Sequence, residues 1–344
     1  MDNTNLPSQP PNSPAESRGS ISSEDGAPSG ALVFLVGPAQ EEIPVDVTGL
    51  REASSVFAEL LAPHAMEMQG ISYPGGSGLF ASPLPREIAL PDDDAFAMKA
   101  IIYALAFPGR FIRPTTPSDP APGPSVREFL HLAVAIKKYK LQDNWFVPWP
   151  RWFEAVVDKV KANGTAQEMV WLVAAAWQLG QRRRFAELGL DLMVKHEGRA
   201  GSYFRFCERD GVVQRALPLK FWCLIGERAA RLHKRVVDLV RSRAQDDGCG
   251  CGGRAEVNSA WASVYDEYGW CAAVPLSELL GAAELLAEQE AASVAEECDC
   301  MGERDLGPAA VREELEKFKR EAKICVECML MDEGSHSVAN SVYH

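Results

Sequence analysis

Three short segments constrain the fold of this chain more than any other feature. Residues 50–57 have helical spacing, residues 88–94 run from apolar residues into three consecutive aspartates, and residues 132–139 carry an apolar helical face that ends in Lys-Tyr. Each pattern is typical of packing or helix capping, and none contains residues typical of catalysis. The three segments therefore predict how the front of the chain packs, and they offer no candidate catalytic residue.

Two strands and a helix are predicted to begin the ordered chain. Residues 31–36 form a short apolar strand that ends at Gly37 and Pro38, and residues 43–47 are its expected hairpin partner. One continuous helix follows. Its apolar or small residues recur at intervals of three and four: Leu50, Ala53, Ser54, Phe57, Leu60 and Leu61.

An acidic triplet precedes the next predicted helix. Residues 87–90 predict a short strand, and Asp92, Asp93 and Asp94 stand where a helix over residues 95–107 begins. Carboxylates at a helix start accept hydrogen bonds from the free N–H groups and face the positive end of the helix dipole. The alternative is a metal site, but loops that bind hard cations separate their ligands with spacers and usually include glycine.

From Val126 onward the sequence is helical almost without interruption. The first of these helices has an apolar face formed by Phe129, Leu132, Ala133, Ile136 and Leu141, with Lys137, Lys138 and Lys140 expected in solvent. Further amphipathic helices are predicted over residues 151–161, 166–179, 185–194 and 221–242.

Together these segments resemble the BTB/POZ domain in sequence, order and spacing. The resemblance covers residues 31–145. It rests on the motifs Leu50-x-x-x-Ser54-x-x-Phe57, Leu90-Pro91-Asp92-Asp93 and Leu132-Ala133-x-x-x-x-Lys138-Tyr139. Asp46 departs from the pattern, since many members carry His there. The resemblance implies an α+β domain, with a small sheet packed on helices, that holds other proteins and does not transform substrates.

The chain is expected to divide into five parts. Residues 1–30 are rich in Pro and Ser and lack apolar periodicity, so they predict a disordered tail. The BTB/POZ domain over 31–145 is followed by a helical extension over 146–215, which resembles that of fungal BTB proteins. Residues 216–332 predict an all-α C-terminal domain with cysteine pairs, and 333–344 a flexible tail.

The formal charge of −13 argues against a nucleic-acid partner, because such binding depends on Lys and Arg. Three consecutive arginines at 182–184 are read as the solvated end of a helix, where cations face the last carbonyls, in preference to an RNA contact. No segment has the pattern of a signal peptide or a membrane span. The cytoplasm or nucleus is therefore the expected location, and no membrane partner is predicted.

Paired cysteines predict a structural zinc site. Four thiolates would complete a closed tetrahedron, with two from a pair three apart within the final helix and two from a pair flanked by glycine. These residues are Cys325 with Cys328 and Cys249 with Cys251, while Cys298 and Cys300 compete for the same positions. The alternative is that reduced cysteines are buried as small apolar residues, as expected of Cys207, Cys223 and Cys271.

The sequence contains no nucleophile elbow, phosphate loop or zinc-protease helix, so neither catalytic residues nor a small-molecule substrate is predicted. We expect a non-catalytic protein-interaction module. The resemblance implies either an adaptor that docks onto a cullin scaffold for ubiquitin ligation, with a groove built by residues 150–195, or a self-associating scaffold. A hypothesis from another class is a zinc-stabilised structural or redox-responsive regulatory protein that uses the cysteine pairs.

Overall fold

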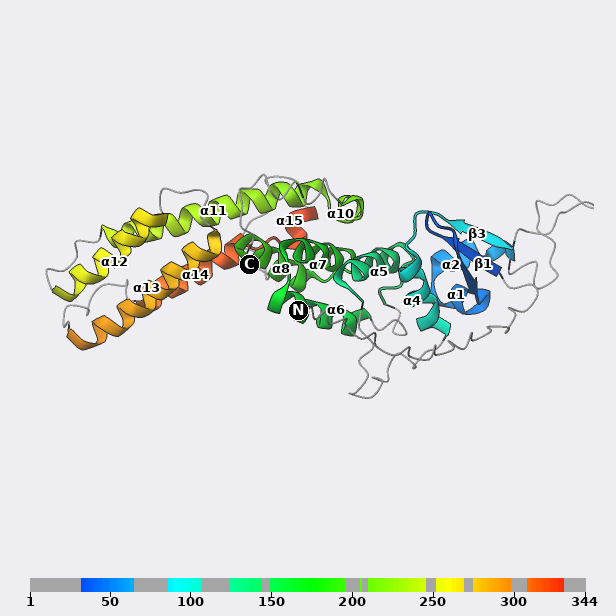
Figure 1. The fold of residues 1–344 in the computed structure, drawn as a ribbon, viewed down its shortest axis with the longest axis horizontal. Coiled ribbons are helices and arrows are strands. Elements are labelled where there is room, and N and C mark those ends of the chain that lie inside the picture. Colours follow the sequence, from blue (N-terminus) through cyan, green and yellow to red (C-terminus); the bar gives the residue numbers. More distant parts are fainter. Residues whose placement is uncertain are drawn as a thin grey trace, which may run out of the picture.

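The computed structural model describes residues 32–64, 86–106, 124–143, 149–195, 205, 210–245, 252–268, 275–297 and 308–330. The described part is elongated, with a small sheet at one end, a group of helices in the middle and longer helices at the other end (Figure 1). The predicted tails at 1–30 and 333–344 lie outside the described residues.

The sheet has three short strands in the order β2-β1-β3. β1 (Leu32–Val36) pairs antiparallel with β2 (Glu41–Val45) and parallel with β3 (Glu87–Leu90). Alternate residues of β1 are buried, as expected when a sheet packs one face on a core. The predicted strands and their hairpin are confirmed, although β2 begins two residues earlier than predicted and Val47 belongs to the helix that follows.

The first predicted helix is two helices, so the expectation of one continuous helix was wrong. α1 (Val47–Ala53) ends at Ser54, which is extended with φ −150° and ψ 131°, and α2 (Ser55–Leu60) begins directly after it. The Ser54 hydroxyl accepts hydrogen bonds from the backbone N–H groups of Val56 and Phe57 at 3.1 and 3.2 Å. Serine competes with the helix for backbone donors, and here it breaks one helix to cap the next.

α4 (Ala95–Ala106) packs against β2, and α5 (Val126–Lys138) packs against α4. α5 begins with a capping box between Ser125 and Glu128. It ends in a Schellman motif, in which the N–H groups of Lys140 and Leu141 donate to the carbonyls of Lys137 and Ile136. Lys140 occupies the left-handed position of this motif with φ +52°.

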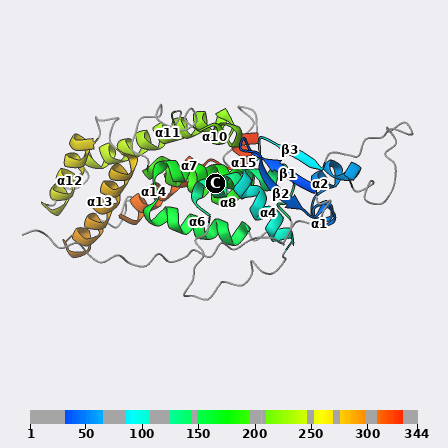
Figure 2. The same cartoon turned by 45° about the vertical axis from the view of Figure 1, so that its right-hand side comes forward.

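The middle group consists of α6 (Trp149–Asn163), α7 (Ala166–Gln178) and α8 (Arg182–Lys195). Figure 2 shows α6 running along one side of α7 and α8. Phe129 of α5 stacks on Phe153 of α6 with ring centroids 5.6 Å apart, which joins this group to the front of the chain. The arginines at 182–184 begin α8, so the expectation that they face the last carbonyls of a helix was wrong, whereas Arg182 and Arg183 are exposed as expected.

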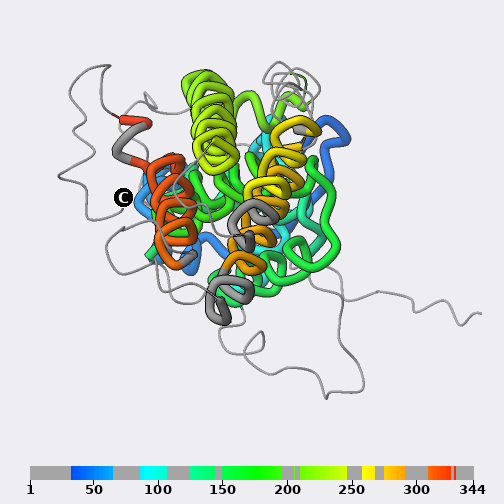
Figure 3. The backbone as a smooth tube through the Cα atoms, turned by 90° about the vertical axis from the view of Figure 1, so that its left-hand side faces the viewer, coloured from blue at the N-terminus to red at the C-terminus, as the bar shows by residue number. Residues whose placement is uncertain are grey.

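Six helices complete the described chain. They are α10 (Gly211–Ala216), α11 (Leu219–Ala244), α12 (Gly252–Tyr268), α13 (Leu276–Glu297), α14 (Pro308–Ala322) and α15 (Val326–Leu330). With 26 residues, α11 is the longest helix in the described part, about 39 Å. Seen end on, α11, α13 and α14 lie side by side as a bundle (Figure 3).

The buried residues of the sheet and the helices form one hydrophobic cluster. Phe185 of α8 and Phe221 of α11 contribute a tilted aromatic pair, with centroids 5.5 Å apart, that joins the middle helices to the long ones. The described part of the chain thus has a small α+β region at the front, followed by helices alone. None of the helices described has both the length and the apolar character needed to cross a bilayer.

Candidate protein interface

A buried polar contact joins the start of α4 to the end of α5. The carboxylate of Asp93, a residue that is 8% exposed, accepts hydrogen bonds from Lys138 Nζ and the Tyr139 hydroxyl, both at 2.7 Å. The Ser54 hydroxyl donates to the Tyr139 carbonyl at 2.5 Å. Burial, and then the hydrogen bond to Asp93, raise the pKa of Tyr139 well above its usual value, so the phenol stays a donor.

The three aspartates of the acidic triplet differ in their surroundings. Asp94 caps α4 as predicted, because its Oδ1 accepts from the Ala97 N–H at 3.0 Å, and its Oδ2 lies 3.6 Å from His131 Nδ1. Asp93 is buried in the contact to Lys138 and Tyr139, whereas Asp92 is exposed. Two of the three carboxylates therefore bind groups of the protein itself.

The outer face of α4 carries exposed aromatic side chains. Phe96 and Tyr103 are 38% and 44% exposed, and their spacing of seven residues places them on one side of the helix, about 10 Å apart along its axis. Lys99 lies between them, three residues after Phe96, and forms an ion pair with Glu41 of β2. We call Phe96, Lys99 and Tyr103 the α4 outer face.

Its surroundings hold the α4 outer face in place. The opposite side of α4 is buried through Ala97, Met98, Ile101 and Ala104. The contact made by Asp93 fixes the turn that leads into α4. Since an exposed aromatic pair on a rigid helix is typical of a surface that binds another protein, the α4 outer face is the candidate interface.

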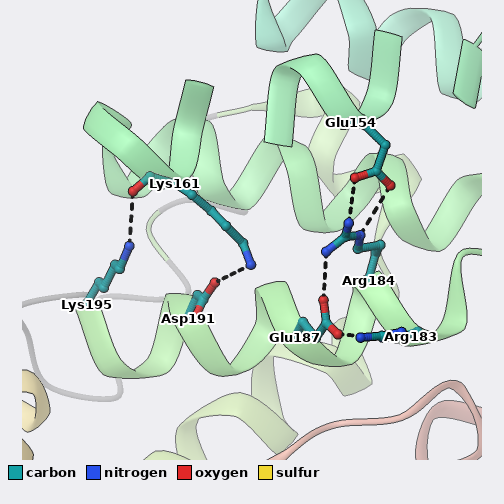
Figure 4. A network of polar contacts seen from close by, with 7 residues as sticks. All are labelled: Glu154, Lys161, Arg183, Arg184, Glu187, Asp191 and Lys195. Atoms are coloured by element: carbon teal, nitrogen blue, oxygen red, sulfur yellow. Dashed lines mark hydrogen bonds and ion pairs between the residues drawn. The ribbon is translucent and has the colours of Figure 1, made fainter. Parts of the chain in front are cut away.

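An ionic clamp holds α6 against α8 (Figure 4). Arg184 of α8 donates from Nε and Nη2 to the two carboxylate oxygens of Glu154 of α6, at 3.2 and 2.5 Å. Its Nη1 donates to Glu187 at 3.0 Å, and Glu187 also accepts from Arg183 Nε at 2.8 Å. The forked contact of Arg184 fixes both distance and orientation between the two helices.

A second pair of contacts extends this clamp along α6. Lys161 Nζ lies 3.4 Å from Asp191 Oδ2, and Lys195 Nζ donates to the Lys161 carbonyl at 3.3 Å (Figure 4). Burial opposes ionisation of Glu187, but the hydrogen bonds from Arg183 and Arg184 outweigh it and lower the pKa of this carboxyl. α6 and α8, which lie in the region predicted to build a partner groove, are thus fixed to each other by ion pairs as well as by apolar packing.

Two of the six cysteines predicted as zinc ligands lie within the described residues. Cys325 is 2% exposed and lies between α14 and α15, so its expected position within the final helix was wrong, while Cys328 lies in α15. Cys249, Cys251, Cys298 and Cys300 lie outside the described residues. Within the described part of the chain, no three His, Cys, Asp or Glu side chains cluster as metal ligands would. The zinc site therefore stays a prediction.

Of the three cysteines expected to be buried as small apolar residues, the structure describes Cys223. Cys223 lies on α11 and is exposed, so that expectation was wrong for this residue. It follows Phe221 and Trp222, which occupy the buried side of the helix at this point. Cys207 and Cys271 lie outside the described residues.

Sequence reasoning missed two features of the long helices. One is a buried ion pair between Arg243 of α11 and Glu290 of α13. The other is a pocket between α11 and α14 lined by Arg228, Arg231 and Arg235. The three arginines are spaced i, i+3 and i+7, so the sequence shows them as a basic stripe on one helix. The groups that Arg228 contacts at the end of α14 lie about 90 residues later in the chain, so no local pattern indicates this contact.

Comparison with known proteins gives no match: no protein-family model, curated protein or solved structure is similar to this chain.

Proposed function

We propose that this chain is a non-catalytic adaptor whose N-terminal region is of BTB/POZ type and binds a protein partner through the α4 outer face. The observation that carries the proposal is the exposure of Phe96 and Tyr103 on one side of a helix whose other side is buried. The resemblance of residues 31–145 supports it, because the residues of its three motifs make the contact among Ser54, Asp93 and Tyr139.

The partner proposed is a cullin-type scaffold, which makes the chain an adaptor for ubiquitin ligation. The resemblance also implies self-association, but the α4 outer face combines two aromatic side chains with the ion pair between Lys99 and Glu41. Non-obligate interfaces, between proteins that are also stable on their own, combine apolar with charged or polar groups in this way, whereas homodimer interfaces are more apolar.

Affinity purification of the full chain from native cells tests the proposal, with Phe96→Ala compared against Leu285→Ala. Leu285 is a matched control because it is an exposed apolar residue, 55% exposed, on the distant helix α13. A hot-spot aromatic residue contributes about 2 kcal/mol or more to binding, so Phe96→Ala should weaken the affinity for the cullin on the order of 30-fold and reduce its recovery. Leu285→Ala should leave it unchanged.

Three results would contradict the adaptor proposal. The wild-type chain could recover no cullin, or Phe96→Ala could leave recovery unchanged. Light scattering could instead show a dimer that Phe96→Ala dissociates, which would assign the α4 outer face to self-association.

The zinc alternative is tested separately by metal analysis of the purified protein and by thermal unfolding with and without a chelator. Stoichiometric zinc and loss of folding in chelator would support a structural site built from the cysteine pairs. Protein that contains no zinc and unfolds at the same temperature in chelator would remove it.

A further inference from the structure

A basic helix stands out in this acidic protein. α11 carries seven Lys and Arg residues and only two acidic residues, although the whole chain has a formal charge of −13. Arg228, Arg231 and Arg235 lie on one stripe of this helix and line a cavity of about 60 Å³ against the end of α14. We call this cavity the arginine pocket.

Two of these arginines are held by the end of α14. Arg228 Nη1 donates to the carbonyls of Glu321 and Lys323, at 2.5 and 3.1 Å. Arg235 Nη1 donates to the Glu321 carboxylate, and its guanidinium lies over the Phe318 ring, 4.6 Å from the centroid. Guanidinium groups fixed in this way lose little conformational freedom when they bind a further acceptor.

The third arginine is held more weakly. Arg231 forms its ion pair with Glu227, one turn earlier on α11, and the two side chains are 62% and 58% exposed. Exposed pairs of this kind contribute little to stability, so an incoming acid exchanges readily with Glu227. Glu227 and Glu321 also demonstrate that carboxylates fit against these arginines.

From this geometry we infer that the arginine pocket binds an acidic peptide segment of a partner protein, with one carboxylate on Arg231 and Arg235. The lining has three guanidinium groups, which meet the carboxylate of Glu321 within the lining and that of Glu227, which pairs with Arg231 from beside it. Leu232, Phe318 and Ala322 add apolar walls, which suit an apolar residue next to the acid in the peptide.

Peptide is favoured over nucleic acid because of the charge of the chain. The charge of −13 on the whole chain repels an extended polyanion, whereas a short segment with a few carboxylates meets mainly the local field of α11. The inference goes beyond the proposed function, because it concerns α11 and α14 and does not depend on α4.

The test is fluorescence anisotropy of a labelled short peptide that alternates glutamate and leucine, titrated with the full chain. Arg231→Gln should weaken binding about tenfold, because one charge-assisted hydrogen bond is lost. Lys234→Gln is the matched control: it removes the same charge from an exposed position of α11 that does not line the pocket, and should change binding by less than about twofold. Glu227→Gln should strengthen binding about threefold, since the competing carboxylate is removed.

Four outcomes would overturn the inference. The wild-type chain could fail to bind the peptide at millimolar concentration. Arg231→Gln and Lys234→Gln could weaken binding equally, which would indicate non-specific electrostatic attraction to α11. A glutamine–leucine peptide could bind as tightly as the acidic one. A single-stranded oligonucleotide could bind more tightly than the peptide and displace it. Phe96→Ala should leave peptide binding unchanged, so failure here and failure of the adaptor proposal are distinguishable.

Discussion

Arg243 of α11 and Glu290 of α13 face each other inside the bundle, with Nη1 and Oε1 3.6 Å apart and each side chain only 6% exposed. Among the described residues, Arg243 Nη1 and Glu290 Oε2 have no hydrogen-bond partner. Taking two charges out of water is costly, and attraction at this distance without full hydrogen bonding offsets the cost only in part. The pair therefore fixes how α13 lies on α11 more than it stabilises the fold.

Removing one partner of this pair should destabilise the protein strongly. Arg243→Met leaves Glu290 as an uncompensated buried charge, so the free energy of unfolding should fall by about 3–5 kcal/mol. The double variant Arg243→Met/Glu290→Met should recover most of this loss, because both charges are gone. Chemical denaturation of the three proteins measures it, and a double variant less stable than Arg243→Met alone would contradict the explanation.

Ser54→Ala should destabilise the front of the chain by about 1–2 kcal/mol, since it removes both the cap of α2 and the hydrogen bond to the Tyr139 carbonyl. Ser55→Ala is the control, because Ser55 is exposed at the first position of α2. Thermal unfolding compares the two. Equal small effects would show that the break between α1 and α2 does not depend on the Ser54 hydroxyl.

Asp93→Ala should cost about 2–3 kcal/mol, because it leaves the buried Tyr139 hydroxyl without its acceptor. Asp92→Ala removes the same charge from an exposed neighbour and should change stability by less than about 0.5 kcal/mol. If Asp92→Ala were as damaging as Asp93→Ala in denaturant unfolding, the triplet would have a joint role, such as the metal site considered for this sequence.

Lys140→Gly should stabilise the protein by about 1 kcal/mol, because Lys140 has a left-handed backbone, φ +52°, that costs a side-chain-bearing residue energy. Gly180 occupies the equivalent position after α7, with φ +67°. Gly180→Ala should therefore destabilise by about the same amount. The pair of thermal unfolding measurements would contradict this explanation if both substitutions shifted stability in the same direction.

Acid should weaken the ionic clamp by protonating Glu187, which holds the Arg184 side chain that reaches α6. Its folded-state pKa is lowered, so its contribution to stability is present above the unfolded pKa, about 4.3, and is lost as pH falls through the lower folded value. The stability difference between wild type and Glu187→Gln should be constant near neutral pH and shrink below about pH 4.3. Denaturant unfolding across this range measures it, and a difference that grows on acidification would reverse the assigned sign.

Local patterns are sufficient to predict many elements. The apolar run in residues 31–36 and the apolar spacing of residues 126–141 predict β1 and α5, because each depends on residues close in sequence. The break at Ser54 was missed, since its hydroxyl is held by Tyr139, 85 residues later. Spacing alone also placed Cys325 within a helix, whereas α14 ends at Ala322.

The sequence by itself determined the approximate strands, the approximate limits of α4, α6, α7, α8 and α11, the cap at Asp94 and the acidic balance of the chain, since propensity, periodicity and charge are local or additive properties. Tertiary structure alone decided that Asp93 is buried against Tyr139, that Phe96 is left exposed on α4, and that Arg228 meets the end of α14. The two contacts join segments far apart in the chain, and the exposure of Phe96 depends on which neighbours pack around α4. The contacts form only when packing fixes the relative positions of whole helices, and no local pattern specifies those positions.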